Sequence, residues 1–212
     1  MGLSLTTTTG KVLASLALVG TAAGVAGLGT YGAFSSTTQA ETKVASGTVL
    51  MALGATDGAE NRLNLAADGL VAGDIVQRAV KLSNAGTEDF AAITLATKAV
   101  PAAEGAALPK LVTDPTHGLK LRIQSCSVPW TETGTSPAFI YKCGGETKTI
   151  LKNQAVVLAA PVKLNLKALH AHQSDNLLVT MTLPDTADQT FAGQDSRIGF
   201  TFTATQRAGI NK

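Results

Sequence analysis

The chain of 212 residues has few aromatic side chains, few charges and only two cysteines. Aromatic residues make up 4% and charged residues 15% of the sequence, and 17 Lys and Arg nearly balance 15 Asp and Glu. Nucleic acids and anionic membranes require clustered positive charge in their partners, so we expect neither as the main partner. A near-neutral surface also does little to oppose association between copies of the chain.

The sequence also lacks the usual catalytic motifs. It has no H-E-x-x-H of zinc proteases, no G-x-S-x-G nucleophile elbow, and no glycine-rich loop ending in Lys-Ser/Thr. His170 and His172 share one face if extended, and with Asp175 or His117 they are weak candidates for a Zn²⁺ site. Histidines on a polar turn are more often solvated. We therefore expect no metal, no cofactor and no enzymatic activity.

A second weak metal candidate is the acidic turn near the C-terminus. Asp185, Asp188 and Asp195 supply oxygen ligands that suit Ca²⁺. Aspartates at turns more often cap the backbone, and we expect that use here.

The two cysteines, Cys126 and Cys143, are expected to form one disulfide if the chain is exported. The bond closes a loop of about sixteen intervening residues, which is worth roughly 3 kcal/mol on the loop-entropy model. Two free thiols are the alternative. A metal site is disfavoured because there is no C-x-x-C and no histidine between the cysteines.

The N-terminal region has the layout of an export signal. Lys11 is the only charge before Glu41, and residues 12–34 form an uncharged run rich in Ala, Gly, Leu and Val, with small residues near its end. The run is also long enough to cross a bilayer of about 30 Å, so a retained anchor is the alternative. Several glycines weaken that helix, and we predict a cleaved leader.

Alternation of apolar and polar residues predicts several strands downstream. Residues 176–183 place Leu177, Val179 and Met181 on one face, with Leu178 opposite, and the mature chain is long enough for one core. The other predicted strands are 197–205, 119–126, 73–82 (with Arg78 breaking its apolar face), 93–100, 48–53 and 156–166.

Residues 102–117 and 127–142 are predicted to be loops, and a helix within 100–111 has no support from periodicity. The Cys-bracketed loop 127–142 holds Trp130, which either packs on the disulfide or forms an adhesive patch with its threonines. Short strands separated by Gly and Pro turns predict an all-β, jelly-roll-like antiparallel β-sandwich preceded by an N-terminal export signal helix.

Four segments resemble the camelysin and TasA family of exported surface and biofilm-matrix proteins of Gram-positive bacteria. They are Gly29-Thr30-Tyr31-Gly32-Ala33-Phe34, Ala45-Ser46-Gly47-Thr48-Val49, the pair Leu70–Arg78 with Leu82–Thr87, and Phe202-Thr203-Ala204-Thr205-Gln206. The third departs from the family pattern, since Ala72 replaces its proline.

The resemblance implies cleavage between Ala33 and Phe34 by a SipW-type signal peptidase, although Ala40 is an alternative site. It also implies extracellular fibres that assemble by donor-strand exchange, in which the mature N-terminus of one subunit adds a strand to the sheet of the next. Residues 34–45 suit a donor because they are Ser/Thr-rich and contain no Pro or Gly. The donor residues include Phe34, Thr37, Thr38 and Val44.

Residues 1–33 are thus a predicted signal peptide, 34–47 an extended candidate donor segment and 48–212 the sandwich. The predicted function is a structural subunit of an extracellular fibre, matrix or cell surface. Its partners would be other copies, the signal peptidase, and other matrix or cell-wall components. The alternatives are a camelysin-like surface metallo-endopeptidase and a membrane-anchored adhesin or fibre-base protein.

Overall fold

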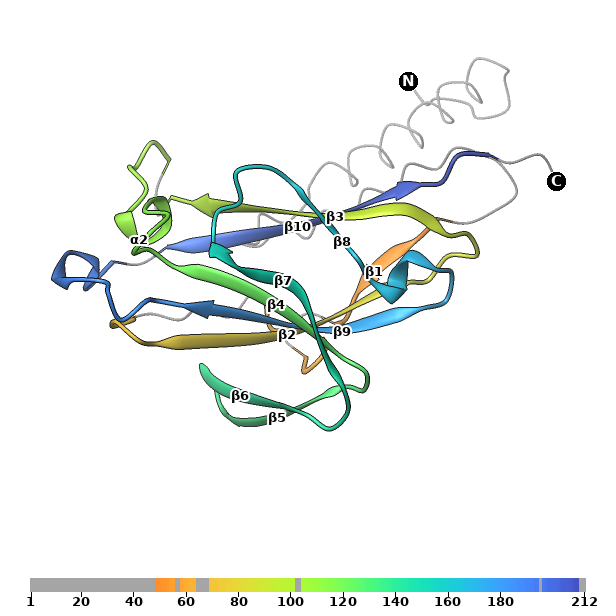
Figure 1. The fold of residues 1–212 in the computed structure, drawn as a ribbon, viewed down its shortest axis with the longest axis horizontal. Coiled ribbons are helices and arrows are strands. Elements are labelled where there is room, and N and C mark those ends of the chain that lie inside the picture. The colour runs from red at the N-terminus through yellow and green to blue at the C-terminus, as the bar shows by residue number, and fades with distance from the viewer. Residues whose placement is uncertain (1–48, 56–57, 64–68, 102–103, 195, 210–212) are drawn as a thin grey trace, which may run out of the picture. The chain divides into compact units, whose positions relative to one another are not determined.

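The computed structural model describes residues 49–55, 58–63, 69–101, 104–194 and 196–209. These residues belong to one compact unit, Ala33–Lys212. Antiparallel sheets pack as a sandwich, which confirms the predicted all-β fold class (Figure 1). The predicted signal helix, cleavage site and donor segment lie outside the described residues. Within those residues, no helix has the length and apolarity needed to cross a membrane.

Two sheets form the sandwich, and every strand pair in them is antiparallel. The five-stranded sheet has the order β1 (Met51–Leu53), β2 (Ile75–Asn84), β9 (Ser174–Thr182), β4 (Lys120–Cys126) and β7 (Thr147–Ala155). The three-stranded sheet has the order β10 (Arg197–Gln206), β3 (Phe90–Val100) and β8 (Val162–Leu164). The short helices are α2 (Lys110–Thr113), η1 (Lys167–Leu169) and η2 (Gln189–Phe191).

The main core lies between the sheets and follows from the alternation in the sequence. Successive strand side chains point to opposite faces, so each strand buries every second residue. The buried residues that carry this pattern are Val80, Leu82, Leu121, Ile123, Leu177, Val179, Ile198, Phe200 and Phe202. Alternation places Arg78 on the same side of β2 as Val80, and its side chain is 1% exposed.

A hairpin of β5 (Trp130–Thr135) and β6 (Ala138–Cys143) covers part of the outer face of the five-stranded sheet (Figure 1). Ala79 of β2 and Leu178 of β9 are buried there against Tyr141. The prediction that 127–142 is a loop is therefore wrong. The hairpin also explains why Leu178, expected on the solvent side of a half-buried strand, is only 2% exposed.

Two further expectations differ from the structure. The strand predicted over 156–166 is reduced to β8, because Pro161 cannot donate a ladder hydrogen bond. The carbonyl of Val156 instead accepts a hydrogen bond from the Thr97 hydroxyl at 2.6 Å. The sequence does not predict strand β7, because its register against β4 shifts twice and these bulges break the period of two. The other predicted strands are present with small changes in their ends.

Candidate assembly site

A site that accepts a strand must be an open sheet edge, because only there are backbone N–H and C=O groups unpaired. In the described part of the chain, the edge strands of the sandwich are β1 and β7 of one sheet and β10 and β8 of the other, and both strands of the separate β5–β6 hairpin are edges as well. β1 and β8 have three residues each. β7 and β10, with nine and ten residues, are therefore the two longest edge strands.

β10 is the edge with fewer features that block pairing. Its ten residues pair with β3 and contain no charge between Arg197 and Arg207. The register shifts only at its end, between Thr205 and Gln206. Ile198, Phe200 and Phe202 anchor the strand in the core, while the side chains opposite are small or hydroxylated. A regular, uncharged edge of this length is a template for an added strand.

β7 has two of the features by which proteins block edge pairing. Its register against β4 shifts on both sides of the Ile123 pairing, and Lys148 and Lys152 are exposed. Bulges and lysines on an edge disfavour the addition of another strand. β7 is therefore the weaker acceptor of the two.

The free side of β2 beyond β1 is covered by Gly54 and by residues 60–62 rather than left open. Asn61 forms an isolated bridge with Val80. Backbone hydrogen bonds continue the contact: Gly54 N to Lys81 O at 2.9 Å, Lys81 N to Glu60 O at 2.7 Å, and Arg62 N to Ala79 O at 2.9 Å. This segment acts as a short extra edge strand.

The hairpin holds this covering segment in place through a polar network. The Arg62 guanidinium donates to both carboxylate oxygens of Glu132, at 2.7 and 3.0 Å, and lies 4.8 Å from the centre of the Phe139 ring. The Tyr141 hydroxyl donates to the same carboxylate at 2.7 Å. The two side chains of the ion pair are 20% and 16% exposed, so the pair is less screened than one at the surface.

The network shifts the ionisation of its members. Hydrogen bonds from Arg62 hold the pKa of Glu132 below its ordinary value. Burial, followed by the neighbouring Glu132 carboxylate, raises the pKa of Tyr141 to about 12. Burial lowers the pKa of Arg78, and the nearby Tyr141 and Glu132 oppose that effect. Each shift follows from removing a charge from water or placing it beside another.

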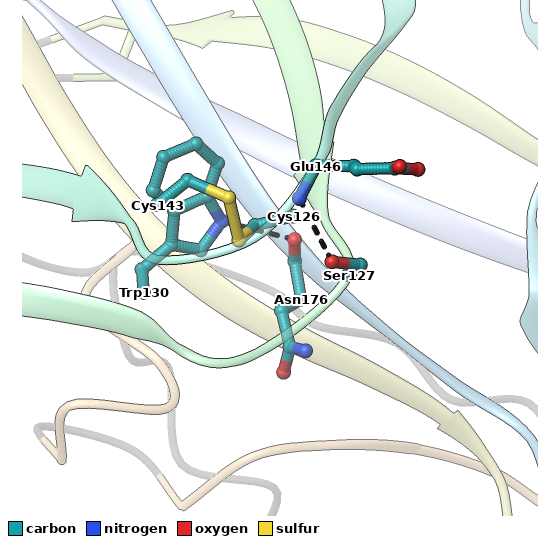
Figure 2. The surroundings of a disulfide bond; sticks show 6 residues. All are labelled: Cys126, Ser127, Trp130, Cys143, Glu146 and Asn176. Carbon is teal, nitrogen blue, oxygen red and sulfur yellow. Dashed lines mark hydrogen bonds between the residues drawn. A yellow bond between two sulfur atoms is a disulfide. The ribbon is translucent and has the colours of Figure 1, made fainter.

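A disulfide fixes the base of the hairpin to the sheet. Cys126 at the end of β4 and Cys143 at the end of β6 are bonded, with their Cα atoms 5.8 Å apart. Trp130 lies beside this disulfide and donates its indole N–H to the backbone oxygen of Asn176 at 3.0 Å (Figure 2). Of the two expectations for Trp130, the structure favours packing near the disulfide over an exposed adhesive patch.

The predicted metal candidates do not come together. His170 is paired with Asp89 at 3.0 Å, while Asp175 is buried and accepts the backbone N–H of Ala168 at 2.8 Å. His117 instead lies beside Asp114. Among the described residues, no group of three or more His, Cys, Asp or Glu side chains has a geometry that could hold a metal ion.

Asp188 has the capping use expected for the acidic turn. Its carboxylate accepts the Thr190 backbone N–H at 2.8 Å, and hydrogen bonds from Thr190 lower the Asp188 pKa. Asp195 lies outside the described residues.

The residues that resembled a family motif have structural roles at the two ends of β2. Gly73 has a φ of +91°, which favours glycine. The carboxylate of the next residue, Asp74, accepts a hydrogen bond from the Val71 backbone N–H at 2.8 Å. At the other end, Asn84 is buried and its side chain accepts the Gly86 N–H at 3.0 Å. These residues form the turns that begin and end β2. Arrangement of the strand, rather than chemistry, accounts for them.

Comparison with known proteins gives one family match. Residues 7–106 match the model of a family described as camelysin metallo-endopeptidase. The match includes most of the predicted leader, the candidate donor segment, β1, β2 and β3. No curated protein sequence matches the chain.

Proposed function

We propose that this chain, which belongs to the camelysin and TasA family over residues 7–106, is a structural subunit of an extracellular fibre or matrix. It assembles through its mature N-terminus. Export and removal of residues 1–33 form the first step. Cleavage after Ala33 frees residues 34–45, which then add as a strand to a neighbouring subunit.

The observation that carries the proposal is the edge of β10, which has only β3 as a neighbour among the strands that the structure describes. Ten residues without an internal charge offer backbone groups over most of the strand's length. A donor of twelve residues, 34–45, has the length and the Ser/Thr-rich composition to match it. Main-chain hydrogen bonds then supply affinity, and the donor's alternate side chains supply register.

The first experiment compares fibre formation by secreted protein that starts at Phe34 with a variant lacking residues 34–45. Electron microscopy should show fibres only for the full mature chain. The finer pair is Thr37→Pro with Thr38→Pro against Thr37→Ala with Thr38→Ala, because proline removes ladder donors while alanine keeps them. Fibres from the deletion variant would disprove donor-strand assembly.

A cross-link identifies the acceptor edge. Val44→Cys combined with Thr203→Cys on β10 should give intermolecular disulfides in fibres under mild oxidation. The matched combination, Val44→Cys with Asn153→Cys on β7, should not. Cross-links in the Asn153→Cys combination, and none in the Thr203→Cys combination, would identify β7 as the acceptor strand instead.

The second candidate function is proteolysis, because the matching family is described as a metallo-endopeptidase. Casein hydrolysis that a chelator abolishes, and that is lost in His170→Ala with His172→Ala, would establish it. The third candidate, a retained anchor, is tested by N-terminal sequencing of secreted protein. Release beginning at Phe34 would exclude the anchor.

A further inference from the structure

The outer face of the five-stranded sheet contains a small open hollow beside the hairpin. Residues 59–60 and 129–130 line it together with residues of β2 and β9. Its cavity volume is about 70 Å³, room for a few water molecules. We call it the Trp130 hollow, lined by Glu60, Lys81, Pro129, Trp130 and Asn176 among others.

The Trp130 hollow combines a fixed apolar surface with a polar rim. The indole of Trp130 is held by its hydrogen bond to the Asn176 carbonyl, and Pro129 extends the apolar wall. On the rim, Lys81 and Glu60 form an ion pair at 3.0 Å, with 37% and 56% of their side chains exposed. The side-chain amide of Asn176 has no hydrogen-bond partner among the described residues.

We propose that the Trp130 hollow binds a neutral sugar ring of an extracellular polysaccharide. Opposite charges lie side by side on the rim, so a simple anion or cation meets repulsion as well as attraction. A hydroxyl both donates and accepts hydrogen bonds, and so it fits the ammonium, the carboxylate and the amide together. The C–H face of a sugar packs against Trp130 and Pro129, an apolar surface with few polar groups, as in many ligand sites.

The size and position of the hollow agree with this ligand. A space of about 70 Å³ that opens to solvent admits the edge of one ring while the rest of a polymer continues outside. The hollow lies on the five-stranded sheet, whereas β10 belongs to the other sheet. Sugar binding and strand addition therefore use different surfaces of one subunit.

The test uses Trp130 itself, because it is the only tryptophan in the chain. Full-length secreted protein is titrated with neutral hexasaccharides of glucose and of N-acetylglucosamine while tryptophan emission is recorded. We expect a saturable change with a dissociation constant in the millimolar range or tighter. Glu60→Gln with Lys81→Met should weaken binding by about tenfold or more, equivalent to about 1.4 kcal/mol. The control Ile140→Ser, at a residue that is 64% exposed on the hairpin, should leave it unchanged.

Four results would overturn the proposal: no saturable change with either sugar, equal affinity in the double variant, a response only to charged polymers at low salt, or an equal response to a peptide of residues 34–45. The inference rests on the proposed function only for the chain's extracellular location. Deleting residues 34–45 tests assembly without a sugar, and the titration tests binding without fibres, so either can fail alone.

Discussion

Removing the disulfide should destabilise the whole sandwich by a measurable and calculable amount. The perturbation is Cys126→Ser with Cys143→Ser, which replaces both sulfurs with small polar groups. The bond joins residues 17 apart in sequence, and the loop-entropy model assigns such a closure about 3 kcal/mol at 25 °C. Domains of this size are commonly stable by about 5–15 kcal/mol, so the double variant should remain folded.

Urea unfolding followed by tryptophan emission measures this loss directly, since Trp130 lies beside the disulfide (Figure 2). The wild-type protein should lose about 3 kcal/mol of unfolding free energy when it is reduced, and the double serine variant should already show that loss. Reductant should have no effect on the variant, which serves as the control. A difference below about 1 kcal/mol between oxidised wild type and variant would refute the idea that the bond restrains the unfolded chain.

Three further predictions concern the polar network and the hairpin core. Because the Tyr141 pKa is raised to about 12, the contribution of Tyr141 to the free energy of unfolding is complete below pH 10 and is lost as the pH rises toward 12. Urea unfolding across that range should show this loss of stability, and Tyr141→Phe should remove the pH dependence. The Glu132 pKa is lowered, so the pairing of Glu132 with Arg62 should stabilise the fold above about pH 4.5 and lose this effect as the pH falls further. A double-mutant cycle of Arg62→Met and Glu132→Gln should give an interaction energy of about 0.5–3 kcal/mol at pH 7 and a smaller one in acid. Leu178→Ala should lower the free energy of unfolding by about 2–5 kcal/mol, measured by thermal or urea unfolding. Ile140→Ala, at an exposed residue, should change it by less than about 0.5 kcal/mol. Similar losses in the two variants would contradict the hairpin's role as a cover.

The sequence predicts strands well where burial alone decides which residues are apolar. β10 and β4 alternate because one face of each meets the core between the sheets, and β9 does so except at Leu178, which the hairpin covers. Arg78, which interrupts this pattern on β2, is nevertheless buried. For these strands the period of two in the sequence follows directly from which side chains pack in the core.

The sequence does not predict the hairpin, because apolar and polar residues exchange their usual sides on its two strands. Glu132 points to the buried side, where Arg62 and Tyr141 satisfy its carboxylate, while Ile140 is 64% exposed. A polar residue inside and an apolar residue outside cancel the signal that identifies a strand. Only the fold brings Arg62 within reach of Glu132, since the two are 70 residues apart in sequence.

The sequence likewise does not identify the candidate acceptor strand, because an open edge is a property of the strand order in the sheet and not of any one strand. β10 and β9 both alternate in sequence, yet β9 lies between β2 and β4 whereas β10 has one neighbour among the described strands. Composition predicted a strand-forming donor segment, but the edge that could receive it becomes visible only when the strands are assembled.

The distribution of blocked and open edges has a consequence for the shape of any assembly. β7 has bulges and lysines, and the side of β2 is covered by a segment that the hairpin holds through Arg62 and Glu132. If β10 is the one favourable acceptor and residues 34–45 are the one donor, each subunit makes two different contacts, one as donor and one as acceptor. Such head-to-tail contacts form a filament when the rotation between subunits does not close a ring. Opening a second edge, by releasing the hairpin, should therefore convert fibres into branched or amorphous aggregates.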